Sequence, residues 1–321
     1  MRLSALSLAT ALACGTLSSM AMAGDLVPMT IATGVDPSFA PFYVAKAGGI
    51  FEEHGLDVTV NTGPSGSAMI AFLIGNQIQA AYGAEQAGVS AHAVDPNVVA
   101  VADGTELVDW LSIVAADGIS DLEGLVGKRI GVAAGTGSET FWKAVVAHHG
   151  LDPAAYEIVN VEAPEMVAAL ERGNIDAFAA WEPWPTRATS AIAGTSIVET
   201  NREVLNLHNL IYMNAEWVGE NTEAAVAFVQ SMRDAKALIE AEPEKAVDLV
   251  AGFLRQPEEL VAELLGKVRF IIEMDEATLN AYDVAITQLT AAGKLEVEMA
   301  PSDMVYPGLL EAIDPALVRL P

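Results

Sequence analysis

The 321-residue sequence is poor in cysteine and in basic residues, and each shortage excludes a class of protein. Its one cysteine, Cys14, excludes a disulfide framework and a paired-cysteine metal site. Lysine and arginine total 16 against 43 aspartates and glutamates, which gives a net charge of −27 without any Lys/Arg-rich stretch. Because nucleic acids and anionic membrane surfaces are bound through basic patches, we expect neither as a partner.

The first 23 residues have the layout of a secretory signal peptide. Arg2 supplies the positive start, residues 3–17 carry no charge, and Ala21-Met22-Ala23 offers a small-x-small cleavage site. The apolar run is shorter than the roughly 20 residues that span a bilayer. A lipid anchor on Cys14 is disfavoured by Ala11, which stands where a lipidation motif has leucine, and a buried N-terminal helix is the other alternative. We expect a secreted, periplasmic protein without a thiol.

Short apolar runs alternate with amphipathic helical patterns in the rest of the chain, which is typical of an α/β protein. Residues 27–33, 56–60 and 78–82 are predicted strands, and helical patterns follow them. The cycle restarts at 128–133, and "MIAFLIGNQIQAAYG" and "MVAALERGNIDAFAAWEP" both predict a helix, a glycine and a strand. The chain is mostly helical after Trp217. We therefore expect two similar α/β lobes.

The sequence gives little support to catalysis. None of the histidines stands at a His-x-x-x-His or Glu-x-x-His spacing; they are His54, His92, the adjacent pair His148 and His149, and His208. No Gly-x-Ser-x-Gly occurs, and the glycine-rich run from Gly135 to Ser138 lacks the lysine of a phosphate-binding loop. We expect no catalytic residues, no metal and no cofactor.

Four blocks carry a resemblance to a known family: "APFYVAKAGGIFEEHGLDVTV", "GPSGSAMIAFLIGNQIQAAYG", "DLEGLVGKRIGVAAGTGSETFWKAVVAHHGLD" and "EMVAALERGNIDAFAAWEPW". Together they resemble the periplasmic solute-binding proteins of ABC importers, in the group that takes taurine, aliphatic sulfonates, nitrate and thiamine-pyrimidine precursors. The resemblance implies a two-lobed type II binding protein, α/β in class, with a ligand cleft between a lobe of residues 24–114 plus 209–321 and a lobe of residues 115–208. It also implies a monomer that closes on a small solute and delivers it to an ABC permease and its ATPase.

The candidate binding residues lie in loops that follow predicted strands, because ligands of open α/β sheets bind outside the carboxyl ends of the strands. These residues are Ser38, Phe39, Phe42, Ser65, Ser67, Glu85, Gln86, Glu106, Asp109, Trp110, Thr136, Gly137, Ser138, Trp181, Glu182 and Trp184.

Two of these loops, Ser65-Gly66-Ser67 and Thr136-Gly137-Ser138, stand at predicted helix starts. Backbone N–H groups and the helix dipole bind anions at such positions. The alternative is plain N-capping, which uses the same residue types. The matching positions in both lobes, in a family that binds anionic groups, favour contact with an anion.

Acidic and aromatic residues are interleaved in the other loops. Trp181 and Trp184 flank Glu182 and are predicted to cage an ammonium group; the alternative is one core tryptophan and a carboxylate that accepts hydrogen bonds between the lobes. The loop with Glu106, Asp109 and Trp110 also combines acidic residues with a tryptophan. Glu85 is either a ligand contact or a solvated helix cap.

The candidate loops contain no arginine or lysine, which favours a monoanion or a zwitterion over a dianion. Taurine has an ammonium and a sulfonate, so taurine or an alkanesulfonate is the predicted solute. A pyrimidine precursor or other aromatic heterocycle stacked between tryptophans is the first alternative, and nitrate or bicarbonate the second. An enzyme like the related pyrimidine synthase is disfavoured because its cysteine-rich motif is absent, and a sensor domain would need a membrane-tethered signalling segment.

Overall fold

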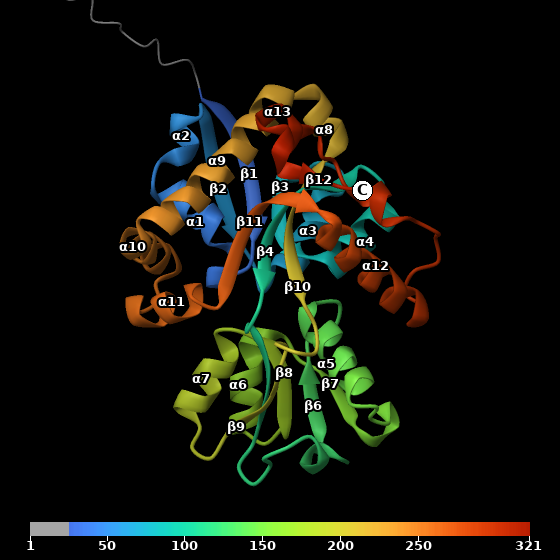
Figure 1. Cartoon of the computed structure of the whole chain (residues 1–321). Coiled ribbons are helices and arrows are strands. Elements are labelled where there is room, and N and C mark those ends of the chain that lie inside the picture. The colour runs from blue at the N-terminus through green and yellow to red at the C-terminus, as the bar shows by residue number, and fades with distance from the viewer. Residues whose placement is uncertain (1–25) are drawn as a thin grey trace, which may run out of the picture.

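The computed structural model describes residues 26–321, which form two α/β lobes joined by two chain crossings (Figure 1). The predicted signal peptide and Cys14 lie outside the described residues. We define lobe I as residues 26–107 and 207–321, and lobe II as residues 111–200. Each lobe has its own sheet, as the sequence pattern predicted.

Lobe I is built on a seven-stranded sheet in the order β12-β11-β4-β10-β3-β1-β2. β1 runs parallel to β2 and β3, whereas β10 is antiparallel to both β3 and β4. The strands are β1 (Val27–Thr33), β2 (Leu56–Thr62), β3 (Ala80–Ala84), β4 (Val98–Leu107), β10 (Leu207–Asn214), β11 (Val268–Asp275) and β12 (Val318–Arg319).

Helices cover both faces of this sheet (Figure 1). They are α1 (Ala40–Ala47), α2 (Ile50–Glu53), α3 (Gly66–Ile70), α4 (Glu85–Val94), α8 (Ala215–Glu220), α9 (Thr222–Ala241), α10 (Pro243–Leu254), α11 (Glu258–Leu265), α12 (Glu276–Ala291) and α13 (Gly308–Ile313), with the 3-10 turn η1 (Pro37–Phe39) after β1. The chain after Trp217 is therefore mostly helical, as predicted, and it also contributes β11 and β12 to the sheet.

Lobe II has a five-stranded sheet in the order β7-β6-β8-β5-β9. Its strands are β5 (Leu111–Ala115), β6 (Arg129–Val132), β7 (Glu157–Asn160), β8 (Ala177–Trp181) and β9 (Ser196–Thr200), and its helices are α5 (Gly137–His148), α6 (Ala163–Glu171) and α7 (Trp184–Ala191). β6 is parallel to β7 and β8, and β5 is antiparallel to β8 and β9.

The crossings between the lobes fall at other residues than the resemblance implied. β5 pairs with β8 and β9 inside lobe II, so the first crossing is at 108–110 rather than after residue 114. The return crossing is at 201–206, and it leaves His208 in lobe I rather than in lobe II. Hydropathy did not reveal the first break because β4 and β5 are both buried along nearly their whole length.

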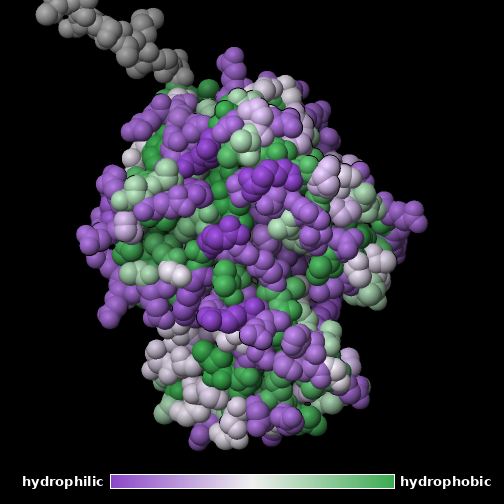
Figure 2. All heavy atoms as spheres, viewed as in Figure 1, coloured by the Kyte–Doolittle hydropathy of each residue, from purple (hydrophilic) through white to green (hydrophobic). Residues whose placement is uncertain are grey.

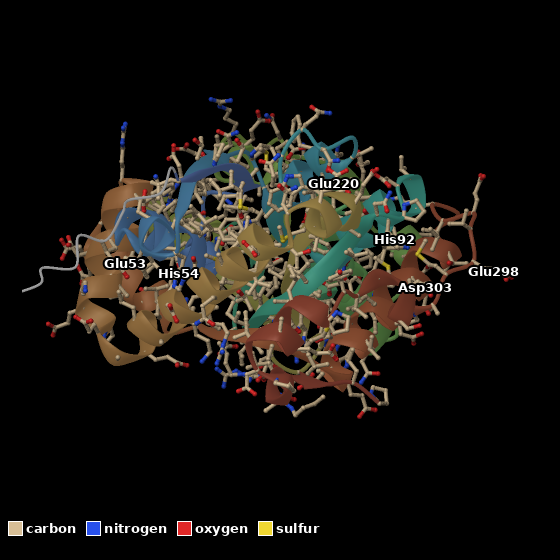
Figure 3. All side chains as sticks on the ribbon, turned by 90° about the horizontal axis from the view of Figure 1, so that it is seen from above. Glu53, His54, His92, Glu220, Glu298 and Asp303 are labelled. Carbon is tan, nitrogen blue, oxygen red and sulfur yellow. The ribbon has the colours of Figure 1, made fainter. Side chains whose placement is uncertain are left out.

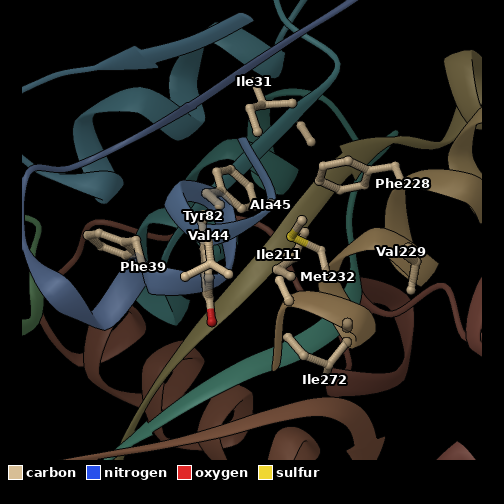
Figure 4. Packing of buried hydrophobic residues seen from close by; sticks show 14 of the residues in the cluster. Ile31, Phe39, Val44, Ala45, Tyr82, Ile211, Phe228, Val229, Met232 and Ile272 are labelled. Carbon is tan, nitrogen blue, oxygen red and sulfur yellow. The ribbon is translucent and has the colours of Figure 1, made fainter. Parts of the chain in front are cut away.

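Aromatic rings fill the core of lobe I on the face covered by α1, α2 and α9. Phe42 packs edge-on against Phe228 with centroids 5.8 Å apart, and Phe51 stacks on the same ring at 6.0 Å. Figure 4 shows Phe228 with Met232, Ile211 and Tyr82 in this cluster. Burial of such side chains stabilises the fold by about 1.5–3 kcal/mol each, so the core gives the loops of the cleft a rigid support.

Charged and polar side chains dominate the face of the molecule in Figure 2, with smaller apolar areas between them. Figure 3, which views the molecule from above, shows His54 and His92 well apart. Within residues 26–321, no helix combines the length and apolar composition needed to cross a bilayer. Within the same residues, no His, Cys, Asp and Glu side chains are grouped in threes to hold a metal ion.

Candidate ligand-binding site

A cavity between the lobes contains about 410 Å³ of space not filled by protein atoms, part of it open to solvent. Both lobes and the first crossing contribute to its wall. The lining residues are Asp36, Ser38, Phe39, Ser65, Gly66, Ser67, Ala84, Leu107, Leu207, His208 and Asn209 from lobe I, with Trp110, Leu111, Thr136, Gly137 and Trp181 from the crossing and lobe II. Eight of the predicted residues therefore meet at one cavity: Ser38, Phe39, Ser65, Ser67, Trp110, Thr136, Gly137 and Trp181.

The turn after β1 is held in place by hydrogen bonds from three directions. Asp36 Oδ1 accepts from the backbone N–H of Ser38 at 3.1 Å and from the Ser38 hydroxyl. Thr105 Oγ1 donates to the Ser38 carbonyl at 3.0 Å, and Asn209 Nδ2 donates to Ser38 Oγ at 3.2 Å. The turn itself and two strands, β4 and β10, thus fix the position of Ser38 in the cavity wall.

In lobe I, the start of α3 lies close against β3. The Ser65 hydroxyl caps α3 by accepting from the Ala68 N–H at 3.1 Å. A Cβ atom on Gly66 would lie 2.2 Å from the Tyr82 carbonyl oxygen, so glycine is required at this position. Because the first N–H groups of a helix have no intrahelical acceptor, Gly66 and Ser67 present donors at the cavity wall.

In lobe II, the hydroxyl groups at the start of α5 are used within the protein. Thr136 Oγ1 accepts from the Ser138 N–H at 3.1 Å and donates to the Ala133 carbonyl at 2.8 Å. Ser138 Oγ donates to the Ala179 carbonyl at 2.6 Å, and Ser138 does not line the cavity. The capping alternative therefore describes the Thr136 hydroxyl, whereas the Ser138 hydroxyl ties α5 to β8. Gly137 brings the backbone of the first helical turn to the cavity.

His208, which lines the cavity on the lobe I side, forms a buried ion pair with Asp103. His208 Nδ1 lies 2.7 Å from Asp103 Oδ2, and the Thr278 hydroxyl donates to the same oxygen at 3.1 Å. Burial favours the neutral imidazole, but the charge and hydrogen bond of Asp103 outweigh it and raise the pKa of His208 to about 9. An imidazolium therefore lines the cavity at neutral pH, although His208 stands alone in the sequence and only the pairing of β10 with β4 brings Asp103 to it.

Two buried carboxyl groups lack a basic partner of this kind. Burial raises the pKa of Asp36 to about 7 against the opposing effect of hydrogen bonds from Ser38 and Trp181. Burial also raises the pKa of Glu85 to about 7, and its Oε2 has no hydrogen-bond partner. Asp36, which the sequence patterns did not single out, lines the cavity; Glu85, which they did, lies behind it.

The structure does not bring the two tryptophans of the predicted cage to one site. Trp181 lines the cavity, but Trp184 lines a separate groove of lobe II, where the Arg187 guanidinium sits 5.0 Å from its ring. Glu182 is buried and accepts from Thr186 Oγ1 and Lys267 Nζ, both at 3.0 Å. Trp181 ends β8 and Trp184 begins α7, so the turn between them directs the two rings to different surfaces.

Other predicted residues are also held away from the cavity. Glu106 pairs with Arg269, and Asp109 pairs with Arg202. Phe42 is a core residue that packs on Tyr82 with centroids 5.2 Å apart. Gln86 is buried beside a second, smaller cavity between α4 and α5. The pattern of acidic and aromatic residues detected the region of the cleft, but it did not show which side chains already have partners.

Two ion pairs connect the lobes across the cleft. Lys267 of lobe I donates to Glu182 of lobe II at 3.0 Å, and Lys294 of lobe I lies 2.9 Å from Glu139 of lobe II. Figure 1 shows α11, which precedes Lys267, and the end of α12, which precedes Lys294, at opposite edges of lobe I. Burial of Glu139 is outweighed by hydrogen bonds from Lys143, Gly135 and Lys294, which lower its pKa to about 2.

Known proteins with similar sequences have names that describe binding proteins. The "Taurine-binding periplasmic protein" of Escherichia coli (strain K12) is 27% identical over 259 residues, which cover 78% of this chain and 77% of that protein. The "Putative aliphatic sulfonates-binding protein" of Bacillus subtilis (strain 168) is 22% identical over 241 residues, 73% of each chain.

A solved structure shows the same fold. The alkanesulfonate-binding protein SsuA from Xanthomonas axonopodis pv. citri, bound to MOPS, superposes with a TM-score of 0.78 at 15% identity, covering 88% of this chain and 99% of that one. The "NMT1/THI5 like" family model matches residues 36–246, which is well over half of the sequence and includes most of the cavity wall. The chain therefore belongs to the NMT1/THI5-like family.

Proposed function

We propose that this protein is the periplasmic solute-binding component of an ABC importer and that its solute is taurine or an alkanesulfonate. The names of its relatives support this proposal, and so does the MOPS-bound SsuA structure, because MOPS is itself a sulfonate. The proposed contacts are Ser38, Phe39, Ser65, Ser67, Trp110, Thr136, Gly137 and Trp181 from the sequence prediction, with Asp36, His208 and Asn209 added from the cavity wall.

The observation that carries the proposal is the composition of this cavity. The His208 imidazolium and the backbone N–H groups that begin α3 and α5 provide positive charge for one anionic head. Phe39, Trp110 and Trp181 provide apolar surface for a short carbon chain. A sulfonate with a small organic tail matches both parts.

The mechanism follows from the position of the cavity between two lobes. A solute that contacts both walls favours the closed arrangement over the open one, because only the closed arrangement makes both sets of contacts. The cross-lobe pairs Lys267–Glu182 and Lys294–Glu139 add to the stability of that closed state. The closed monomer is then recognised by the permease and its ATPase, and no catalytic step is required.

The proposal is tested with protein purified from the periplasm. Its melting temperature and tryptophan fluorescence are measured with taurine, ethanesulfonate, hydroxymethylpyrimidine, nitrate and bicarbonate. At 100-fold its Kd a bound solute stabilises the protein by about 2.7 kcal/mol, which raises the melting temperature measurably. We expect a response to a sulfonate. A response confined to the pyrimidine, to nitrate or to bicarbonate contradicts the sulfonate assignment and retains the importer fold.

A further inference from the structure

The cavity wall carries two side chains of opposite charge that do not neutralise each other. His208 is paired with Asp103 through Nδ1, which leaves Nε2–H as the remaining donor of the ring. Asp36 forms no ion pair among the described residues. Both side chains are nearly inaccessible to solvent, with 3% of His208 and 4% of Asp36 exposed.

Asp36 is unusual because it is buried and yet no cationic side chain within residues 26–321 forms an ion pair with it. Among the described residues that line the cavity, none is lysine or arginine, and His208 is already engaged by a buried acid. Burial of a carboxylate without a cationic partner disfavours its charged form. A cationic group of a bound solute would remove that penalty.

A purely structural role accounts for only part of the Asp36 carboxyl group. Both hydrogen bonds from Ser38 go to Oδ1, which is the oxygen that caps η1. A further hydrogen-bonding influence on Asp36 comes from the side chain of Trp181 in lobe II, and both residues line the cavity. The carboxyl group therefore lies at the boundary between the two lobes, in the wall of the cavity.

We infer that the cavity selects a zwitterion, in which the ammonium group of the solute pairs with Asp36 and its anionic head with His208. This inference rests on the proposed function and narrows it: an aminoalkanesulfonate is preferred over an alkanesulfonate without an amine. The preference originates in lobe I, since both charged side chains belong to that lobe.

The test compares solutes that differ only by the amine. Binding of taurine and ethanesulfonate, and of β-alanine and propionate, is measured by calorimetry on the wild type and on Asp36→Asn. Asparagine keeps an oxygen for Ser38 and preserves the cap. We expect the wild type to bind taurine at least tenfold more tightly than ethanesulfonate. In Asp36→Asn taurine binding weakens at least tenfold, whereas ethanesulfonate binding changes less than threefold.

Asp109→Asn is the matched control. It removes one acidic group near the first crossing, but Asp109 is paired with Arg202 and does not line the cavity. We expect it to leave the ratio of taurine to ethanesulfonate affinity unchanged. If Asp36→Asn weakens the binding of both sulfonates equally, Asp36 has a structural role and the inference is overturned. Unchanged taurine binding in Asp36→Asn overturns it as well.

The anionic pole is tested with the double variant Asp103→Asn/His208→Gln, which removes the buried pair together so that no charge is left unpaired. We expect it to weaken taurine and ethanesulfonate by the same factor, at least tenfold, and to leave their ratio intact. Unchanged affinity for both sulfonates excludes His208 as the anionic anchor.

The β-alanine pair separates the two proposals. Binding of β-alanine that depends on Asp36, without binding of either sulfonate, contradicts the sulfonate assignment and supports the zwitterion. If the wild type binds ethanesulfonate as tightly as taurine, the sulfonate assignment is supported and the inference that the cavity selects a zwitterion is overturned. If the wild type binds neither taurine nor β-alanine, the inference fails.

Discussion

The two walls of the cavity differ in chemistry. Lobe I contributes an acid and a protonated histidine, Asp36 and His208, together with the start of α3. Lobe II contributes an indole, Trp181, and the backbone at the start of α5. The hydroxyl groups at the start of α5 are used within lobe II, since Thr136 caps the helix and Ser138 donates to the Ala179 carbonyl. The two charged side chains of the cavity wall therefore come from lobe I, whereas lobe II contributes an aromatic ring and backbone groups.

The largest expected effect concerns the stability of lobe I. His208→Gln leaves Asp103 buried without its cation, and loss of one partner of a buried ion pair destabilises a protein by about 3–5 kcal/mol. Urea unfolding followed by circular dichroism measures this change. The double variant with Asp103→Asn should recover most of the loss; if it does not, the pair is not the source of the effect.

The next effect is a pH dependence of binding. The pKa of Asp36 is about 7, so an ammonium solute that requires the carboxylate binds more weakly as pH falls below 7. We expect taurine affinity to fall by about 25-fold between pH 7.5 and 5.5, because the ionised fraction of a carboxyl group with a pKa of about 7 falls from about three quarters to about 3% over this range. Calorimetry across this range measures it.

Asp36→Asn should abolish the part of this pH dependence that comes from Asp36. His208, with a pKa of about 9, stays charged throughout this range, and Glu85, with a pKa of about 7, is present in both proteins. A pH profile with the same slope in Asp36→Asn would assign the titration to Glu85 instead.

Asp36 should also reduce the stability of the solute-free protein at high pH. The folded-state pKa of Asp36, about 7, is above its ordinary value of 3.8, so between these values the folded state binds more protons and stability falls as pH rises. We expect Asp36→Asn to be more stable than the wild type at pH 8, on the order of 4 kcal/mol, and nearly equal below pH 4. Urea unfolding at both pH values measures the difference, and equal stability at pH 8 contradicts the prediction.

Smaller effects are expected for the pairs between the lobes. The side chain of Lys294 is 45% exposed, so Lys294→Met should weaken solute binding by a factor of about two to five, in line with 0.2–1 kcal/mol for an exposed pair. Lys236→Met, which breaks a pair within α9, is the matched control. The effect should diminish in high salt, and an effect of equal size in the control would point to net charge alone.

The smallest effect is expected at the tryptophan that the cage hypothesis included. Trp184→Ala should leave solute affinity within a factor of two, because Trp184 lines a different groove of lobe II. Trp181→Ala should weaken binding of every solute and reduce the fluorescence response. Equal losses in the two variants would contradict the assignment of the lobe II wall.

Much of the fold could be predicted from local patterns. Alternation of apolar strands with helical segments predicted the α/β class and the two similar units, and the small hydroxyl residues before α3 and α5 marked two helix starts that meet at the cavity. These features depend on neighbouring residues, so a pattern within one segment is sufficient to reveal them.

The partners of charged groups could not be predicted in this way. Glu182 pairs with Lys267, 85 positions away, and His208 pairs with Asp103 across the β10–β4 ladder. Glu106 and Asp109 have the same residue types as a cation-binding loop but are each neutralised by an arginine. Residue type shows that a charge exists, and only spatial proximity shows whether it is already compensated.

Hydrophobic periodicity and helix capping act over short distances, so local patterns were enough to predict the class of fold, the two lobes and the loops at which a cleft would form. The points at which the chain crosses between the lobes, and the charges that reach the cavity, depend on the folded arrangement. That arrangement placed Asp36 and His208 in the wall and directed Trp184 and Glu182 elsewhere. The physical reason is that desolvation and ion pairing depend on contacts between segments far apart in the chain.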